Sequence, residues 1–187
     1  MNGVTSSGGA ALLVVDVQPT FLRVMPDGEA CLRRCRLAVA AARLLDLPIF
    51  FTEQVPAKLG PTHPDLLLAA GEGHQVFGKT AFSALGAPGL VEAWRAAGIS
   101  HLLLAGLEGP VCVHQTAVAA LRADLGVTLL VDAITERRSA DGAACLAALR
   151  HAGATVLPVE TVFYAMLSDA VDPRFRAFTE LVKQAQG

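Results

Sequence analysis

The fold is predicted by one stretch, Ala10-Ala-Leu-Leu-Val-Val15, which is followed directly by Asp16-Val-Gln-Pro19. Six apolar residues in a row, without the polar alternation of a half-exposed strand, indicate a strand buried on both faces. The polar residues and the proline that follow end this strand. Strands of this kind occur in parallel sheets whose two faces are covered by helices.

The same pattern recurs along the chain and alternates with helical segments. Further apolar runs lie at residues 48–52, 75–77, 101–105, 127–131 and 154–157. Amphipathic segments with helical spacing lie between them, at residues 29–45, 89–97, 112–125 and 139–152, and a last helical stretch follows at residues 173–186. This alternation predicts an α/β fold of three αβα layers around a doubly wound, six-stranded parallel sheet. Right-handed crossovers make 3-2-1-4-5-6 the simplest strand order.

Length and composition predict a single domain of residues 10–187, preceded by a flexible Gly/Ser-rich tail of residues 1–9. Only 17% of residues are charged, against about 25% in an average domain, which favours a homo-oligomer, a dimer or tetramer. No apolar run approaches the ~20 residues of a membrane helix, and no signal peptide is visible, so we expect a cytoplasmic protein. A net charge of -2 with scattered basic residues argues against a nucleic-acid partner.

Three chemically capable side chains follow predicted strands. Asp16 follows the first strand, Lys79 follows the third, and a glycine-containing segment leads from the fourth strand to Cys112. Each residue alone has a structural interpretation, as a turn residue, a solvated charge or a packed thiol. In a doubly wound sheet, however, ligands bind at the carboxyl ends of the strands where the winding reverses. Their joint placement therefore favours one site for a small-molecule substrate.

Cys112 differs from the other three cysteines by its position. It opens the predicted helix after the fourth strand, where unpaired N–H groups and the helix dipole favour a thiolate. Gly106 and Gly109 allow the approach to bend so that amide N–H groups face an oxyanion. Cys145 lies in mid-helix, and Cys31 and Cys35 are spaced for packing on one helix face. No spacing indicates a zinc site or a disulfide framework.

These motifs, in this order and spacing, resemble the isochorismatase-like cysteine hydrolases, which include nicotinamidase and N-carbamoylsarcosine amidohydrolase. The resemblance extends over residues 10–167. It rests on four segments, Val15-Asp-Val-Gln18, Lys79-Thr-Ala-Phe-Ser-Ala84, Gly106-Leu-Glu-Gly-Pro-Val-Cys-Val-His-Gln-Thr-Ala117 and Val131-Asp-Ala133.

The resemblance implies a role for each matching residue. Cys112 would be the nucleophile, Asp16 the general base, and Lys79 the cation that lowers the pKa of the thiol and positions the other two. It also implies a cis peptide bond between Leu107 and Glu108. The backbone N–H groups of Glu108 and Cys112 would then form the oxyanion hole.

The sequence departs from relatives at two places. Where nicotinamidases carry several metal ligands, only Glu53 and His63 remain, and two candidates cannot complete a zinc shell. We therefore expect no metal and no cofactor. The Glu108-Gly-Pro110 approach to the nucleophile is also unusual, so we expect a distinct pocket shape.

The substrate pocket is predicted from residues near strand ends. Phe21 and Phe82 are the preferred pocket walls, and Glu53 is a candidate hydrogen-bond partner for the substrate. Phe77 and Trp94 are equally compatible with a pocket and with the core. His114 is two residues beyond Cys112 on a helix and points away from it.

The predicted function is metal-independent hydrolysis of a C–N bond in a small amide, through a thioester on the cysteine. The alternative is a non-catalytic member that binds a small metabolite or a partner protein through the same site. Hydrolysis of a vinyl ether, as in isochorismatase itself, is disfavoured because the resemblance assigns that reaction to members without the cysteine nucleophile. A nucleotide-binding domain is disfavoured because the G-x-G-x-x-G spacing is missing.

Overall fold

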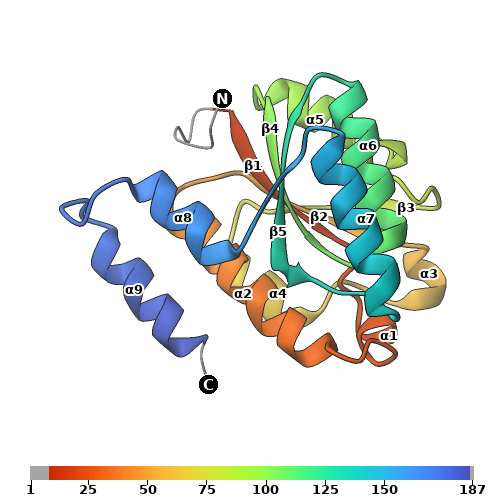
Figure 1. Ribbon diagram of the computed structural model, residues 1–187, viewed down its shortest axis with the longest axis horizontal. Helices are drawn as coiled ribbons and strands as arrows, with labels where there is room; N and C mark the ends of the chain where they lie inside the picture. Colours follow the sequence, from red (N-terminus) through yellow and green to blue (C-terminus); the bar gives the residue numbers. More distant parts are fainter. Residues whose placement is uncertain (1–8, 186–187) are drawn as a thin grey trace.

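A computed structural model describes residues 9–185, in which six parallel strands form one sheet between two layers of helices (Figure 1). The strands are β1 (Ala10–Val15), β2 (Ile49–Gln54), β3 (Gln75–Lys79), β4 (His101–Gly106), β5 (Gly126–Ile134) and β6 (Thr155–Leu157). Their order, β3-β2-β1-β4-β5-β6, confirms the predicted fold class and strand order. Strands β2, β3 and β5 extend beyond the apolar runs that predicted them, into polar residues.

The predicted tail falls almost wholly outside the described residues. Gly9, its last residue, is described, and its carbonyl oxygen accepts hydrogen bonds from the N–H groups of Ser100 and His101, at 2.8 and 3.0 Å. Gly9 is therefore attached to the start of β4.

Helices cover both faces of the sheet (Figure 1). On one face the buried core includes side chains of α2, α4, α8 and α9, and on the other those of α5, α6 and α7. The helices are α1 (Pro19–Leu22), α2 (Gly28–Leu44), α3 (Pro56–Leu59), α4 (Pro64–Ala70), α5 (Leu90–Ala96), α6 (His114–Arg122), α7 (Ser139–His151), α8 (Val159–Leu167) and α9 (Phe175–Gln184). Helices α1, α3, α4 and α8 were not predicted. Each begins at or directly after a proline, which suits a helix start, but each is too short for a clear periodicity.

The position of β1 between two hydrophobic cores explains why its sequence is apolar throughout. Leu12 and Val14 belong to the core on one face, and Leu13 and Val15 belong to the core on the other. All four are fully buried. The strand thus contributes side chains to two cores, and a polar residue at any of these positions would be desolvated.

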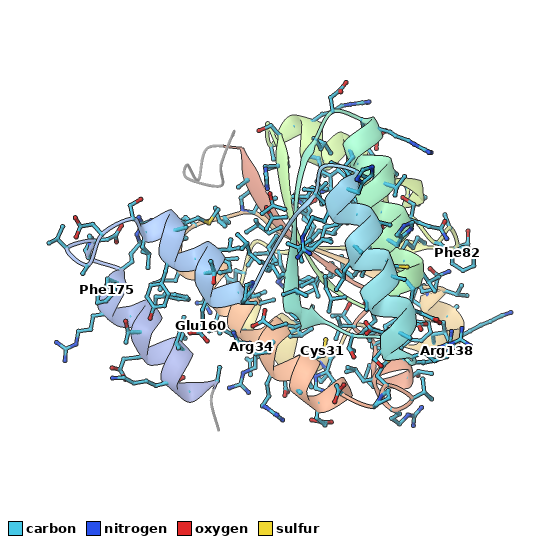
Figure 2. All side chains as sticks on the ribbon, viewed as in Figure 1. Cys31, Arg34, Phe82, Arg138, Glu160 and Phe175 are labelled. Atoms are coloured by element: carbon cyan, nitrogen blue, oxygen red, sulfur yellow. The ribbon has the colours of Figure 1, made fainter. Side chains whose placement is uncertain are left out.

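An ion-pair network fastens the helical layer to the sheet. Arg34 of α2 donates to Asp132 of β5 at 2.7 Å and to Glu160 of α8 at 3.1 Å (Figure 2). Asp132 also accepts a hydrogen bond from the N–H of Val159, at the start of α8. The Val131-Asp-Ala133 motif therefore has a structural role in joining three elements. Within residues 9–185, no helix is both long enough and apolar enough to cross a bilayer.

The winding of the sheet reverses between β1 and β4, where the two strands end together. Val15 pairs with Gly106, and the N–H of Leu107 donates to the carbonyl of Val15 at 2.7 Å. Gly106 has a φ of 114°, and a Cβ atom there would overlap the backbone of Val15. Glycine is therefore required at this position, and it brings the segment after β4 beside the end of β1.

We expect Gly106→Ala to destabilise the protein strongly, because the added methyl meets backbone that cannot move aside. Gly153→Ala is the matched control, since Gly153 has a similar φ of 104° with open space around it. The control should lose about 1–2 kcal/mol from backbone strain alone, and Gly106→Ala should lose clearly more. Urea unfolding of both variants measures the difference. Equal losses would contradict the close approach.

Candidate active site

The predicted site residues meet at the carboxyl ends of β1 and β4, around a cavity of about 180 Å³. Of the residues expected there, Asp16, Cys112, Glu108, Phe21 and Phe82 line the cavity. Its other lining residues are Gln54, Leu107, Val111 and Arg137, none of which was predicted as a pocket residue. Lys79 is not among the lining residues, but its Nζ contacts the carboxylate of Asp16, which is. The walls are apolar, and the polar groups are confined to a few positions.

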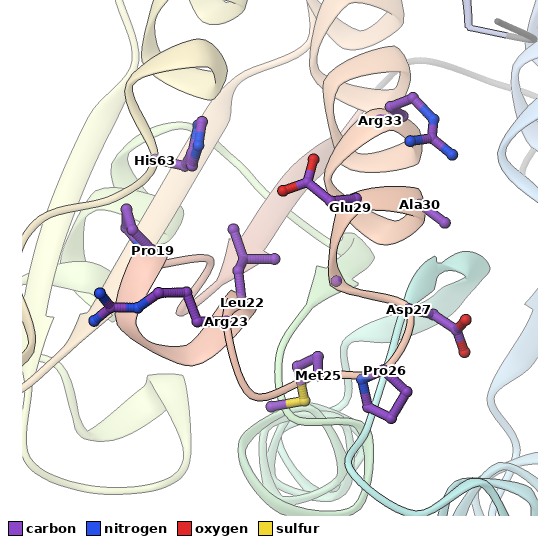
Figure 3. A pocket seen from close by; sticks show the side chains of 11 residues that line it. Pro19, Leu22, Arg23, Met25, Pro26, Asp27, Glu29, Ala30, Arg33 and His63 are labelled. Atoms are coloured by element: carbon purple, nitrogen blue, oxygen red, sulfur yellow. The ribbon is translucent and has the colours of Figure 1, made fainter.

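A larger cavity, of about 480 Å³, lies elsewhere, between α1 and the start of α2 (Figure 3). Its lining combines basic and acidic side chains, including Arg23, Arg33, Asp27 and Glu29. It contains none of the three predicted catalytic residues. The smaller cavity is therefore the candidate active site, because chemically competent groups converge there.

Asp16 is held in an unusual backbone conformation directly after β1. Its φ is 53°, in the left-handed region that Asp tolerates better than most residues, and its N–H donates to the carbonyl of Thr52 at 3.0 Å. The carboxylate is buried. Its Oδ1 accepts from the Thr52 hydroxyl at 2.8 Å, and its Oδ2 accepts from Lys79 Nζ at 2.6 Å. The side chain is thus fixed at both oxygens.

Lys79 ends β3 and has no solvent-exposed side-chain surface. Besides Asp16, its Nζ donates to Gln54 Oε1 at 2.6 Å and approaches the carbonyls of Ala81 and Phe82 at 3.2 Å. An ammonium group has three N–H donors, so its hydrogen-bonding capacity is used entirely within the protein. Lys79 therefore orients Asp16 and Gln54 and has no donor left for a substrate.

Cys112 lies in a π-helical turn, Gly109–Val113, that precedes α6. The helical segment thus begins three residues earlier than predicted, and Cys112 lies inside its first turn. Cys112 as a whole is 7% exposed, and it lines the cavity. Burial, and then the negative charge of Asp16, raise the pKa of the Cys112 thiol to about 12, while Lys79 lowers it by less. Lys79 therefore acts on the thiol pKa in the expected direction, but burial and the charge of Asp16 outweigh it.

Backbone and side-chain contacts hold the segment before Cys112 in place. The peptide bond between Leu107 and Glu108 is cis. The N–H of Gly109 donates to the carbonyl of Thr135 at 3.0 Å, which attaches this segment to the end of β5. The Glu108 side chain is paired with Arg137. The residue proposed to supply an oxyanion N–H is therefore held on both sides.

Glu53, predicted as a hydrogen-bond partner of the substrate, is not among the residues that line the cavity. Its carboxylate accepts from the N–H and hydroxyl of Thr62, at 2.7 and 2.9 Å. Side chains alternate along a strand, so Thr52 and Gln54 share the face that reaches Asp16 and Lys79, while Glu53 faces the other way. This alternation would have identified Gln54 if β2 had been extended past Thr52.

The two remaining metal-ligand candidates have other partners. Glu53 binds Thr62, and the His63 Nδ1 accepts from the N–H of Asp65 at 3.3 Å, where it caps the start of α4. Among residues 9–185, no three His, Cys, Asp or Glu side chains are grouped to hold a metal ion.

Comparisons with known proteins give a family and a fold. A family model described as the isochorismatase domain matches residues 10–161. Isochorismatase domain-containing protein 2 from Bos taurus is 34% identical over 178 residues, which cover 95% of this chain and 84% of that protein. The solved structure of MAR1 ribonuclease from Caenorhabditis elegans is 29% identical, with a TM-score of 0.90, and the match covers 95% of this chain and 91% of that one.

A third likeness concerns the fold alone. The YcaC gene product from Escherichia coli, described as an octameric hydrolase of unknown specificity, is 19% identical with a TM-score of 0.84. The match covers 97% of this chain and 95% of that one.

We expect Asp16→Asn to accelerate alkylation of Cys112 although it removes the candidate base. The substitution deletes the negative charge that raises the thiol pKa and leaves the lowering effect of Lys79. Each unit by which the pKa falls gives about tenfold more thiolate at pH 7. The rate of iodoacetamide labelling, read by peptide mass spectrometry between pH 7 and 10, measures this effect.

Cys145 is the internal control, because its pKa is raised by burial, Asp141 and Glu136 and not by Asp16. Its labelling rate should not change. Circular dichroism checks that the variant, which retains a buried Lys79, is folded. Slower labelling of Cys112 in a folded Asp16→Asn protein would contradict the electrostatic control by Asp16.

Proposed function

The chain belongs to the isochorismatase-like hydrolase family, and on that premise we propose that it hydrolyses a C–N bond of a small amide by covalent catalysis at Cys112. One observation carries the proposal. The Cys112 thiol shares a cavity with Asp16, whose carboxylate is held 2.6 Å from the buried ammonium of Lys79. A thiol, an oriented carboxylate and a fixed cation are the parts of an activated nucleophile.

In the proposed first step, Asp16 takes the proton from the Cys112 thiol as the sulfur attacks the amide carbonyl carbon. The high pKa of the thiol makes this transfer necessary, since little thiolate exists at neutral pH. The C–N bond then breaks, and the protonated Asp16 returns the proton to the leaving nitrogen. The products are a free amine or ammonia and a thioester on Cys112.

In the second step, Asp16 takes a proton from water, which attacks the thioester. The carboxylic acid leaves, and the proton returns to the sulfur, so the enzyme is regenerated. In both steps the carbonyl oxygen becomes negative, and the backbone N–H groups of Glu108 and Cys112 are the proposed donors to it. Such donors typically contribute about 10²–10³ to the rate. The thiol and the backbone supply these steps without a metal.

The cavity favours a small, neutral substrate. Its volume is about 180 Å³, below the roughly 300 Å³ at the lower end of common ligand sites. Each charged side chain that lines it is paired, Asp16 with Lys79 and Glu108 with Arg137. An ionic group on the substrate would lose its water without gaining a free counter-charge. Phe21, Phe82 and Val111 provide apolar surface for the acyl group.

We expect ammonia release from at least one member of a panel of short aliphatic and aromatic primary amides, with charged analogues turned over more slowly. Cys112→Ser should lower this activity by a factor of about 10³ or more. Cys145→Ala is the matched control, because Cys145 lies on α7 outside the cavity, and it should keep full activity. Dialysis against EDTA should have no effect. A coupled ammonia assay measures the activity of the unaltered protein, of the two variants and of the dialysed protein.

Two results would oppose the proposal. If no amide or urea is hydrolysed in a Cys112-dependent manner, while a metabolite or protein binds the intact site, the non-catalytic alternative gains. Since a structural relative is called a ribonuclease, RNA is included in the panel. RNA cleavage that Cys112→Ser abolishes would replace the amide assignment.

A homo-oligomer in the cytoplasm remains our prediction. The ground for an oligomer is the low charged fraction of the sequence, 17%. Light scattering coupled to size exclusion should give a mass at least twice the 19.4 kDa of one chain. A monomer at micromolar concentration would contradict this prediction.

A further inference from the structure

An ion pair whose two side chains have no part in the proposed chemistry lies beside the candidate nucleophile. Arg137, in the segment between β5 and α7, donates from Nε to both carboxylate oxygens of Glu108 at 3.1 Å, and its Nη2 lies 3.0 Å from Oε2. Both residues line the catalytic cavity. The Arg137 side chain is 61% exposed, whereas that of Glu108 is 15% exposed.

The same two segments are also joined through the backbone. The N–H of Arg137 approaches Glu108 Oε1 at 3.3 Å, and the N–H of Gly109 donates to the carbonyl of Thr135 at 3.0 Å. Glu108 is therefore held through its side chain, and its neighbour Gly109 through its backbone. These contacts hold the Glu108 side chain and the peptide that follows Glu108, and so limit the movement of the residue whose N–H is the proposed oxyanion donor.

The charges around the pair argue against direct binding of an anionic substrate by Arg137. Its charge is compensated by Glu108, and the adjacent Arg138 pairs with Asp141 at 2.7 Å. Glu136 adds a further carboxylate, and burial together with Glu108, Asp27 and Asp141 raises the pKa of Glu136. Acidic groups thus outnumber basic ones here, which disfavours a substrate anion.

We propose that Arg137 is a positioning residue that acts through Glu108. By holding the Glu108 carboxylate, it fixes the direction of the Glu108 N–H, one of the two proposed donors to the oxyanion. This inference rests on the proposed function, because it assigns Arg137 a part in the same reaction. Exposed ion pairs contribute little to stability, so the loss of Arg137 should affect the rate and not the fold.

The test uses Arg137→Gln, with Arg138→Gln as the matched control from the neighbouring position. We expect Arg137→Gln to lower kcat for the best amide about 10- to 100-fold, with KM changed less than threefold, since a misdirected donor loses part of an oxyanion contribution. Arg137→Lys should recover only part of kcat, because lysine lacks the planar fork of donors. Arg138→Gln should match the unaltered protein, and all three should unfold at the same urea concentration.

A second measurement distinguishes an effect on oxyanion stabilisation from an effect on the reactivity of the thiol. Alkylation of Cys112 by iodoacetamide displaces iodide and forms no oxyanion, so its rate should be the same in Arg137→Gln and the unaltered protein. Slower alkylation in this variant would overturn the proposal, because Arg137 would then act on the nucleophile itself.

The remaining outcomes are also decisive. If kcat of Arg137→Gln equals that of Arg138→Gln, or if KM rises while kcat is kept, positioning is overturned and the amidase assignment stands. If the unaltered protein shows no Cys112-dependent hydrolysis of any amide, the proposed function fails and this inference fails with it.

Discussion

The buried ion pair between Asp16 and Lys79 is the constraint on which the rest of the site depends. Two charges removed from water are costly unless every donor and acceptor is satisfied. Here the satisfying groups are the Thr52 hydroxyl, the Gln54 amide and two carbonyls after β3. They come from the ends of neighbouring strands, so satisfying the pair also fixes β1, β2 and β3 relative to one another. Because an unsatisfied buried pair would be costly, the positions of these partner groups are tightly constrained.

Burial, together with the same pair, raises the pKa of the Cys112 thiol. A free cation beside Cys112 would favour the thiolate, but the charge of Lys79 is compensated by Asp16, so the proton stays on sulfur. A protonated thiol beside a carboxylate fixes the order of the proposed events, because the proton must leave as the sulfur attacks. The helix start offers less help than expected, since Cys112 lies inside a π-helical turn whose first residue is Gly109.

The sequence predicts those parts of the molecule that depend on local pattern. Unbroken apolar runs such as Ala10–Val15 identify the strands, because a strand with cores on both faces cannot alternate. Asp16, Lys79 and Cys112 are found because residues after parallel strands share one edge. The errors arise where this pattern ends. Strand β2 continues through polar residues, so Glu53 was chosen instead of Gln54. Arg137 was missed because its pairing with Glu108 joins positions 29 residues apart, which no local pattern can indicate.

The two ion pairs at the cavity differ in how far solvent reaches them. The Asp16–Lys79 pair is almost fully buried, so changing either partner leaves an unpaired charge in the core. The Glu108–Arg137 pair is reached by solvent through its exposed arginine, and its changes can be absorbed by water. A substitution of Arg137 therefore leaves the Asp16–Lys79 pair in place and releases only the Glu108 side chain. The two pairs can for this reason be tested separately, because the loss of one does not leave the other unpaired.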